Sequence, residues 1–381
     1  MKRVYWRPPG VSRGALALIA VVAVAALVAV EAFPVKRKQH HYSEKIAAAK
    51  LALRAFTAIK AEKVRRGIPI DPEGDPGKTG LIGQPLSTVT SNTGYITAKR
   101  TSVNPNFAAV LVQLLETAKV KEGDTVAVGV SGSFPALNAC TFAAIQTLKL
   151  HPLVIASASA SEWGANNPEL LWIDMEHLLV RKQVFGFHSI AASRGGIDDR
   201  GFGMSKEGRR IIDAAIERNQ LEMIEPHSLV DSIDKRMQIY DAAAGERPIK
   251  AYINVGGGTA SVGTHVGKKE FRRGLNLEPP HKSGLVDSVM LRFSERDVPV
   301  IHLTGIAGIA RKYGLSIVPE GIPPIGEGNV FVKAEYNRWL AGGGLLLIFL
   351  VMLAFIRMDL GLRILRGGHR KQSATQPQQM I

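Results

Sequence analysis

Two long apolar runs stand near the ends of the chain. Residues 14–30 consist almost wholly of Ala, Val, Leu and Ile, and residues 340–356 form a second run of similar length. Runs of about 17 residues are just long enough to cross a bilayer as helices. A cleaved signal peptide is the alternative for the first run, but the sequence around Val30-Glu31-Ala32 is a poor cleavage site. The pattern therefore favours two membrane anchors.

Between these runs, short apolar segments alternate with segments of helical spacing. Val-rich and Ile-rich runs at 125–130, 153–156, 250–255 and 298–303 are typical of strands that a parallel sheet buries on both faces. Helical patterns or helix start signals predict helices over residues 105–119, 135–150, 168–181, 205–219, 229–244, 283–296 and 305–313. The predicted fold class is α/β: a Rossmann-like three-layer domain with a mostly parallel sheet, flanked by one transmembrane helix at each end.

The same pattern divides the chain into six segments. We expect a cytoplasmic N-terminus (1–13), a transmembrane helix (14–33), a helical stalk with a Pro- and Gly-rich loop (34–103), an extracytoplasmic α/β domain (104–338), a second transmembrane helix (339–356) and a basic cytoplasmic tail (357–381). Basic residues after the second run predict a cytoplasmic C-terminus. Two spans place both termini on one side, so the central domain is expected outside the cytoplasmic (inner) membrane.

Charge narrows the choice of partners. The chain carries a formal charge of +15; the first 35 residues account for +3 and the last 43 for +4, which leaves +8 for the centre. A basic exterior domain favours polyanions. The sequence has no recognition motif, aromatic-basic interleaving or zinc pattern, so nucleic acid is not an expected partner. A single cysteine, Cys140, excludes an intrachain disulfide and a cysteine-based metal cluster.

The first candidate site is the turn Ser131-Gly132-Ser133, between the strand at 125–130 and a helix that begins near Pro135. Proline suits the first helical turn, and the helix would point its positive end and unpaired amides at the turn. This geometry favours an anion. The alternative is that small residues merely make a compact strand-to-helix corner. Neither the phosphate-loop pattern nor the dinucleotide glycine fingerprint matches, so no cofactor is expected.

A second glycine-rich segment, Gly256-Gly257-Gly258-Thr259, follows the strand at 250–255. Ligands of open α/β sheets bind beyond the carboxyl ends of strands, so the two turns suggest one shared crevice. A basic cluster follows shortly and would give that crevice a cationic rim, although a solvated loop is the alternative; its members are Lys268, Lys269, Arg272 and Arg273.

Serines mark the end of the strand at 153–156. If the chain stays extended there, Ser157, Ser159 and Ser161 share one face, next to Trp163. Such a row of hydroxyls would suit a carbohydrate or a peptide-like amide. Small residues at a strand end can also be simply compact.

Other polar residues give weaker signals. Asp198 and Asp199 with His188 are possible metal ligands, but adjacent loop aspartates are more often exposed, so we expect no metal site. The fragment Gly77-Lys78-Thr79 resembles the end of a phosphate loop but lacks the required earlier glycine, and no strand precedes it.

Catalysis is a separate hypothesis. Ser131 and Ser133 are candidate nucleophiles, although a nucleophile elbow requires glycine two residues after the serine, and Gly132-Ser133 follows Ser131. His302, at the end of a predicted strand, is a candidate acid or base, but a core histidine is the commoner case. His188 and His265 are further candidates as the partner of a serine.

Four segments resemble the poly-γ-glutamate system proteins: DTVAVGVSGSFPALN, SASASEWGANNPELLWIDME, SRGGIDDRGFG and NVGGGTASVG. The resemblance covers nearly the whole chain, including both apolar runs. It implies a membrane component of the bacterial machinery that makes or exports poly-γ-glutamate, beside an amide ligase and other membrane subunits. It implies no catalytic residues.

The predicted function is a membrane-anchored accessory component of this machinery, whose basic domain binds the polymer or partner subunits. The alternative is a serine-dependent hydrolase or transferase that acts on γ-glutamyl amide bonds. The expected partners are poly-γ-glutamate or another polyanion, membrane subunits of the synthase or exporter, and the lipid bilayer.

Overall fold

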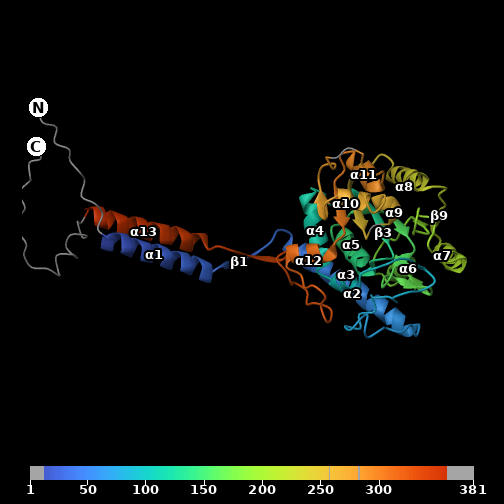
Figure 1. The fold of residues 1–381 in the computed structure, drawn as a ribbon, viewed down its shortest axis with the longest axis horizontal. Helices are drawn as coiled ribbons and strands as arrows, with labels where there is room; N and C mark the ends of the chain where they lie inside the picture. The colour runs from blue at the N-terminus through green and yellow to red at the C-terminus, as the bar shows by residue number, and fades with distance from the viewer. Residues whose placement is uncertain (1–12, 257, 282–283, 358–381) are drawn as a thin grey trace, which may run out of the picture. The chain divides into compact units, whose positions relative to one another are not determined.

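The computed structural model describes residues 13–256, 258–281 and 284–357 (Figure 1). Most of the predicted N-terminal and C-terminal tails therefore lies outside the described residues, as do Gly257 of the second glycine-rich segment and Ser283 at the start of a predicted helix. The chain forms two compact units: Met1–Arg37 with Lys333–Ile381, and Lys38–Val332.

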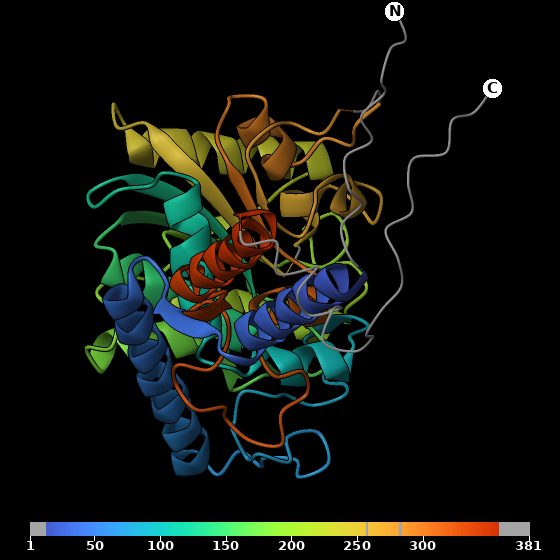
Figure 2. The same ribbon diagram turned by 90° about the vertical axis from the view of Figure 1, so that its left-hand side faces the viewer.

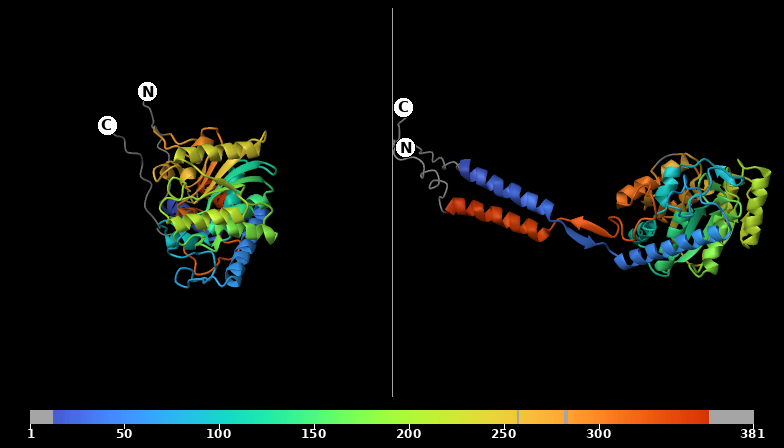
Figure 3. Two further views of the ribbon diagram at one scale, coloured as in Figure 1. Left: turned by 90° about the vertical axis from the view of Figure 1, so that its right-hand side faces the viewer. Right: turned by 90° about the horizontal axis from the view of Figure 1, so that it is seen from below.

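The first unit is built on two apolar helices, α1 (Arg13–Ala32) and α13 (Arg338–Arg357), which lie side by side in Figure 1 and in the right view of Figure 3. Among the described residues, these two helices are long and apolar enough to cross a membrane. They pack closely where a Cβ on Gly344 would lie 2.9 Å from the Ala26 Cβ, as small residues permit between membrane helices. Strands β1 (Val35–Lys38) and β13 (Val332–Glu335) pair beside them.

The second unit contains, in its described residues, a seven-stranded sheet in the order β11-β12-β10-β3-β4-β8-β9. All neighbours are parallel except β11, which is antiparallel to β12. The strands are β3 (Thr125–Ser131), β4 (His151–Ser157), β8 (Ala191–Ser193), β9 (Glu222–Ile224), β10 (Ile249–Val255), β11 (Gly274–Asn276) and β12 (Val300–Leu303). The predicted mostly parallel α/β sheet is confirmed, and the four predicted strands form its centre.

Side chains point alternately to the two faces of the sheet, so both faces present apolar residues, and helices cover both. Val126, Val128 and Val130 of β3 join the core beneath α4 (Phe107–Thr117) and α5 (Pro135–Thr147), whereas Ala127 joins the core beneath α8 (Leu229–Ala244). The left view of Figure 3 shows α8 on one side of the strands. The remaining helices are α3 (Ile96–Ser102), α6 (Trp172–Arg181), α7 (Lys206–Arg218), α9 (Thr259–Val262), α10 (Gly267–Glu270), α11 (Val289–Ser294) and α12 (Ile306–Tyr313).

Residues expected to form a helical stalk belong instead to the compact unit. They form α2 (Tyr42–Arg65), which lies along one side of the unit in Figure 2 and contacts α4 and α5. The small face of this helix packs closely on its neighbours; its fully buried apolar residues are Ala48, Ala49, Ala52, Ala55, Phe56 and Ile59.

The order of the strands reverses between β3 and β10. From β3 the chain passes outward through β4, β8 and β9, then returns along α8 to β10 on the other side of β3. These two strands pair in parallel, with Gly129 opposite Asn254. The two glycine-rich turns therefore follow neighbouring strands at the carboxyl edge of the sheet, as predicted. Open α/β sheets bind ligands at such a reversal.

The turn after β3 packs tightly against the segment that follows β4. The Gly132 N–H donates to the Ser157 carbonyl over 3.1 Å, and the Gly132 carbonyl accepts from the Ala165 N–H over 2.7 Å. A Cβ at residue 132 would lie 2.9 Å from the Ser159 carbonyl oxygen and 3.1 Å from the Ala160 Cβ. Glycine is thus required here for close packing, and its amide is used within the protein.

We predict that Gly132→Ala destabilises the protein by about 1–3 kcal/mol, because overpacking a tight contact forces backbone shifts. Gly321→Ala is the matched control, since no heavy atom lies within 4 Å of an added Cβ there. Thermal unfolding of the purified full-length protein in detergent, followed by circular dichroism, measures both. Equal melting temperatures for the two variants would contradict the packing described here.

Candidate functional site

The two predicted turns meet at the carboxyl edge of the sheet. A Cβ on Gly256 would lie 2.8 Å from Ser131 Oγ and 3.1 Å from the Phe134 ring, and Gly256 has a φ of 92°. Glycine is therefore required at this position both for space and for conformation. Ser131 is buried and its hydroxyl donates to the Val255 carbonyl over 3.4 Å. The turns are packed on each other.

Beside these turns lies Lys99, a residue that the sequence analysis missed. It comes from α3, and only 2% of it is exposed. Its Nζ donates to the Ser133 carbonyl, lies 2.7 Å from Ser161 Oγ and stands 4.2 Å from the centroid of the Phe134 ring. None of these partners is a carboxylate, and no acidic side chain among the described residues forms an ion pair with Lys99.

A second lysine acts on the same region. Burial, and then the charge of Lys268, lower the pKa of Lys99 to about 7, against the opposing effect of Glu162. Lys268, in α10, is half-buried, and burial lowers its own pKa. The charge of one desolvated amino group thus acts on another, and neither forms an ion pair with a carboxylate of the described residues, so the site favours an anion.

His302 lies at the end of β12 in the same neighbourhood. It is fully buried, and its Nδ1 lies 2.9 Å from the Asn254 side-chain nitrogen. Because an amide NH₂ can only donate, the proton of the neutral ring is on Nε2, which has no hydrogen-bond partner among the described residues. Burial, and then the charge of Lys268, lower the pKa of His302 to about 4. The ring is therefore neutral at physiological pH.

The predicted serine and histidine candidates do not form a catalytic pair in the described residues. The Ser131 hydroxyl is bound to a carbonyl, and the Ser133 Oγ accepts from the Ser161 N–H over 3.1 Å. His188 Nδ1 lies 2.7 Å from the Ser189 carbonyl oxygen. No hydrogen bond joins a serine of the turn after β3 to a histidine.

The four residues of the predicted cationic rim differ in their exposure to solvent. Lys268 acts on Lys99 and His302, whereas Lys269, Arg272 and Arg273 are exposed. A Cβ on Gly305 would lie 2.4 Å from Arg273 Nε, so that arginine lies across the start of α12.

In the second glycine-rich turn, the two described members after the gap are packed on other loops. A Cβ on Gly258 would meet Ser157 Oγ at 2.8 Å, and the Thr259 hydroxyl donates to the Gly196 carbonyl over 2.7 Å.

The three serines at and after the end of β4 do not form one row. Ser157 bonds Asp199, Ser159 bonds Ser91 over 3.1 Å, and Ser161 lies against Lys99. The prediction was wrong because β4 ends at Ser157, and extended structure resumes only in β5 (Ala160–Ser161), which pairs with β2 (Thr90–Asn92). Trp163, two residues later, has a φ of 56°, a left-handed conformation that is uncommon for a bulky residue.

Asp199, a possible metal ligand by sequence, is bound by groups of the protein. It is fully buried and lies 2.8 Å from Arg236, which is 1% exposed. Its carboxylate also accepts from Ser193 over 2.7 Å and from Ser232 over 2.6 Å. No cluster of His, Cys, Asp or Glu that could hold a metal occurs among the described residues. This network fastens the 194–203 loop to the ends of β4 and β8.

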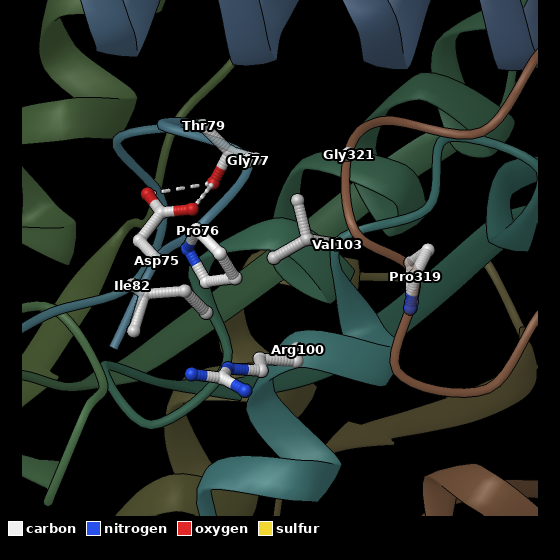
Figure 4. A pocket seen from close by; sticks show the side chains of 9 residues that line it. All are labelled: Asp75, Pro76, Gly77, Thr79, Ile82, Arg100, Val103, Pro319 and Gly321. Atoms are coloured by element: carbon white, nitrogen blue, oxygen red, sulfur yellow. Dashed lines mark hydrogen bonds between the residues drawn. The ribbon is translucent and has the colours of Figure 1, made fainter. Parts of the chain in front are cut away.

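Gly77 and Thr79 of the fragment Gly77-Lys78-Thr79 line a small pocket of about 10 Å³, shown in Figure 4. The Asp75 carboxylate accepts from the Thr79 hydroxyl over 3.0 Å and from the Gly80 N–H over 2.7 Å. A carboxylate of the protein thus occupies the donors that a phosphate would use. A cavity of this size holds at most about one water molecule.

We predict that Asp199→Asn lowers the free energy of unfolding by about 3–5 kcal/mol, because it leaves the Arg236 charge buried without a counter-charge. Asparagine tolerates the left-handed φ of 60° at this position, so the substitution tests charge rather than backbone strain.

Asp241→Asn is the control, since its ion pair with Arg296 is half exposed and its loss should cost less than about 1 kcal/mol. Both are measured by denaturant unfolding of the full-length protein in detergent. Similar losses in the two variants would show that the buried pair does not contribute as described.

No family model, no curated protein and no solved structure matches this chain. The site is therefore interpreted from its own geometry.

Proposed function

We propose that this protein is a membrane-tethered accessory component that binds an anionic polymer, poly-γ-glutamate, at the carboxyl edge of a Rossmann-like sheet. The observation that carries the proposal is the pair Lys99 and Lys268: neighbouring, desolvated amino groups, with no carboxylate of the described residues bound to Lys99.

A buried charge without a counter-charge is costly. A ligand carboxylate placed between the two lysines would remove that cost, and a γ-linked glutamate chain offers one free α-carboxylate per residue. Such binding favours protonated Lys99, so it should weaken as pH rises through the region of the Lys99 pKa, about 7. The exposed residues Lys269, Arg272 and Arg273 would meet further carboxylates along the same chain.

The position of the lysines in the fold supports the proposal. They lie by the turns where strand order reverses, which is where doubly wound sheets bind ligands. The helices α1 and α13 are long and apolar enough to serve as two anchors. In the proposal they lie in the cytoplasmic membrane, with both termini on the cytoplasmic side. Partner subunits of a synthase or exporter would then reach the protein within the bilayer or outside it.

Binding of fluorescently labelled poly-γ-glutamate to the full-length protein in detergent tests the proposal. We predict that affinity falls with added salt, because exposed charges are screened beyond roughly 10 Å at 0.1 M ionic strength. Lys268→Glu should weaken binding about tenfold or more, which corresponds to about 1.4 kcal/mol, because its carboxylate would compete for Lys99.

Lys121→Glu is the matched control. It makes the same change in net charge at an exposed position just before β3, at the amino edge of the sheet. Equal weakening by the two substitutions would contradict specific binding at Lys99 and Lys268. It would indicate only a general attraction between a basic protein and a polyanion.

The membrane topology is tested by reporter fusions. Alkaline phosphatase joined after Arg66 should be active, because it folds outside the cytoplasm, and the same enzyme joined at Ile381 should be inactive. A cytoplasmic fluorescent reporter should show the reverse pattern. Phosphatase activity only at Ile381 would overturn the orientation.

A further inference from the structure

We propose that Ser161 is a nucleophile and Lys99 its general base, in a site that cleaves or transfers acyl groups at amide bonds. The identity of the substrate as a γ-glutamyl amide rests on the proposed function. The assignment of the nucleophile rests on the geometry around Lys99.

The distance between the reacting groups fits this role. Lys99 Nζ lies 2.7 Å from Ser161 Oγ, within the range of about 2.6–3.2 Å expected for a nucleophile and its base. A neutral amine has two N–H groups and one lone pair. The Ser133 carbonyl and the face of the Phe134 ring take the two N–H groups, so the lone pair is left for the Ser161 hydroxyl.

The surroundings favour the neutral form of the base. Burial and the charge of Lys268 bring the pKa of Lys99 to about 7, so a substantial fraction is neutral at physiological pH. An ordinary lysine, with a pKa of about 10.4, would be almost fully protonated there.

Ser161 is distinguished from the other serines at this edge by its partner and its exposure. Ser131, Ser157 and Ser159 are buried, and their hydroxyls bond a carbonyl, a carboxylate and another serine, respectively. Ser133 is half-buried, as Ser161 is, but its Oγ accepts from the Ser161 N–H rather than lying against an amine. Ser161 is half-buried and is the member of this group that lies against an amine. The left-handed Trp163 two residues later adds backbone strain of the kind that clusters at active sites.

The reaction balances with water as the co-reactant. Lys99 takes the proton of Ser161 as Oγ bonds to the carbonyl carbon of the amide. The carbon–nitrogen bond then breaks, and the lysine ammonium gives its proton to the leaving amine. Water attacks the acyl-serine, Lys99 takes a proton from the water, and the carbon–Oγ bond breaks as Ser161 regains its hydrogen. An amine in place of water would give transfer instead of hydrolysis.

The test uses the full-length protein in detergent and a fluorescent fluorophosphonate, with the labelled residue identified by mass spectrometry. We expect labelling at Ser161, its loss in Ser161→Ala, and a fall of at least about a hundredfold in Lys99→Met, because general-base catalysis contributes about 10²–10⁴-fold. Ser159→Ala is the matched control and should label as the unmodified protein does.

The labelling rate of the unmodified protein, measured over a series of pH values, tests the general base without depending on the folding of a variant. The labelling rate should rise through pH 7 and level off above it, because only the neutral lysine accepts a proton. The same preparations should be incubated with poly-γ-glutamate, whose mean chain length should fall in the unmodified protein and stay constant in Ser161→Ala.

The two proposals fail in different ways. Absence of labelling at Ser161, or equal labelling of Ser159→Ala and Ser161→Ala, overturns the catalytic assignment, whereas polymer binding by those same proteins is unaffected. If Ser161 is labelled but Lys268→Glu and Lys121→Glu weaken polymer binding equally, the proposed polymer site is overturned and the assignment of Ser161 as the nucleophile is retained.

Discussion

The contact between the turn after β3 and the segment after β4 determines the arrangement at the carboxyl edge. With glycine at residue 132, the turn can approach within van der Waals contact of Ser159 and Ala160. That approach places the Ser133 carbonyl and Ser161 Oγ within reach of one amino group, Lys99 Nζ. A larger residue in the turn would separate the two acceptors, and the buried lysine would lose its only hydrogen-bond partners among the described residues.

Two buried cations at this edge differ in how they are compensated. Arg236 has a carboxylate and several hydroxyls around it, so its network is complete and contributes to the stability of the 194–203 loop. Lys99 has only neutral hydrogen-bond partners among the described residues, and the largest effect of a neighbouring charge on its pKa comes from another lysine. An ion pair with all its partners in place is a structural element, whereas Lys99, which has no counter-charge, can bind an anion as the ammonium or accept a proton as the neutral amine.

Periodicity was sufficient to predict the long elements of the fold. Four strands, the helix starting at Pro135 and the adjacency of the two glycine-rich turns follow from runs of Val and Ile with small residues after them. Strands β8, β9 and β11 have three residues each, which is too short for an alternating pattern to be visible. Lys99 was missed because a lysine within Ile96–Ser102 looks like any solvated helix residue, and its burial results from tertiary packing of segments distant in sequence. Asp199 looked exposed for the same reason, since its partner Arg236 lies 37 residues later.

The two ends of the Lys38–Val332 unit are joined to each other. The Gln39 N–H donates to the Phe331 carbonyl over 2.9 Å, and the fully buried Phe331 ring packs edge-on against Tyr42. During synthesis, Gln39 and Tyr42 are therefore made almost three hundred residues before Phe331, their native partner. The hydrophobic core of this unit therefore closes only when the chain has been synthesised as far as Phe331, just before α13 begins at Arg338.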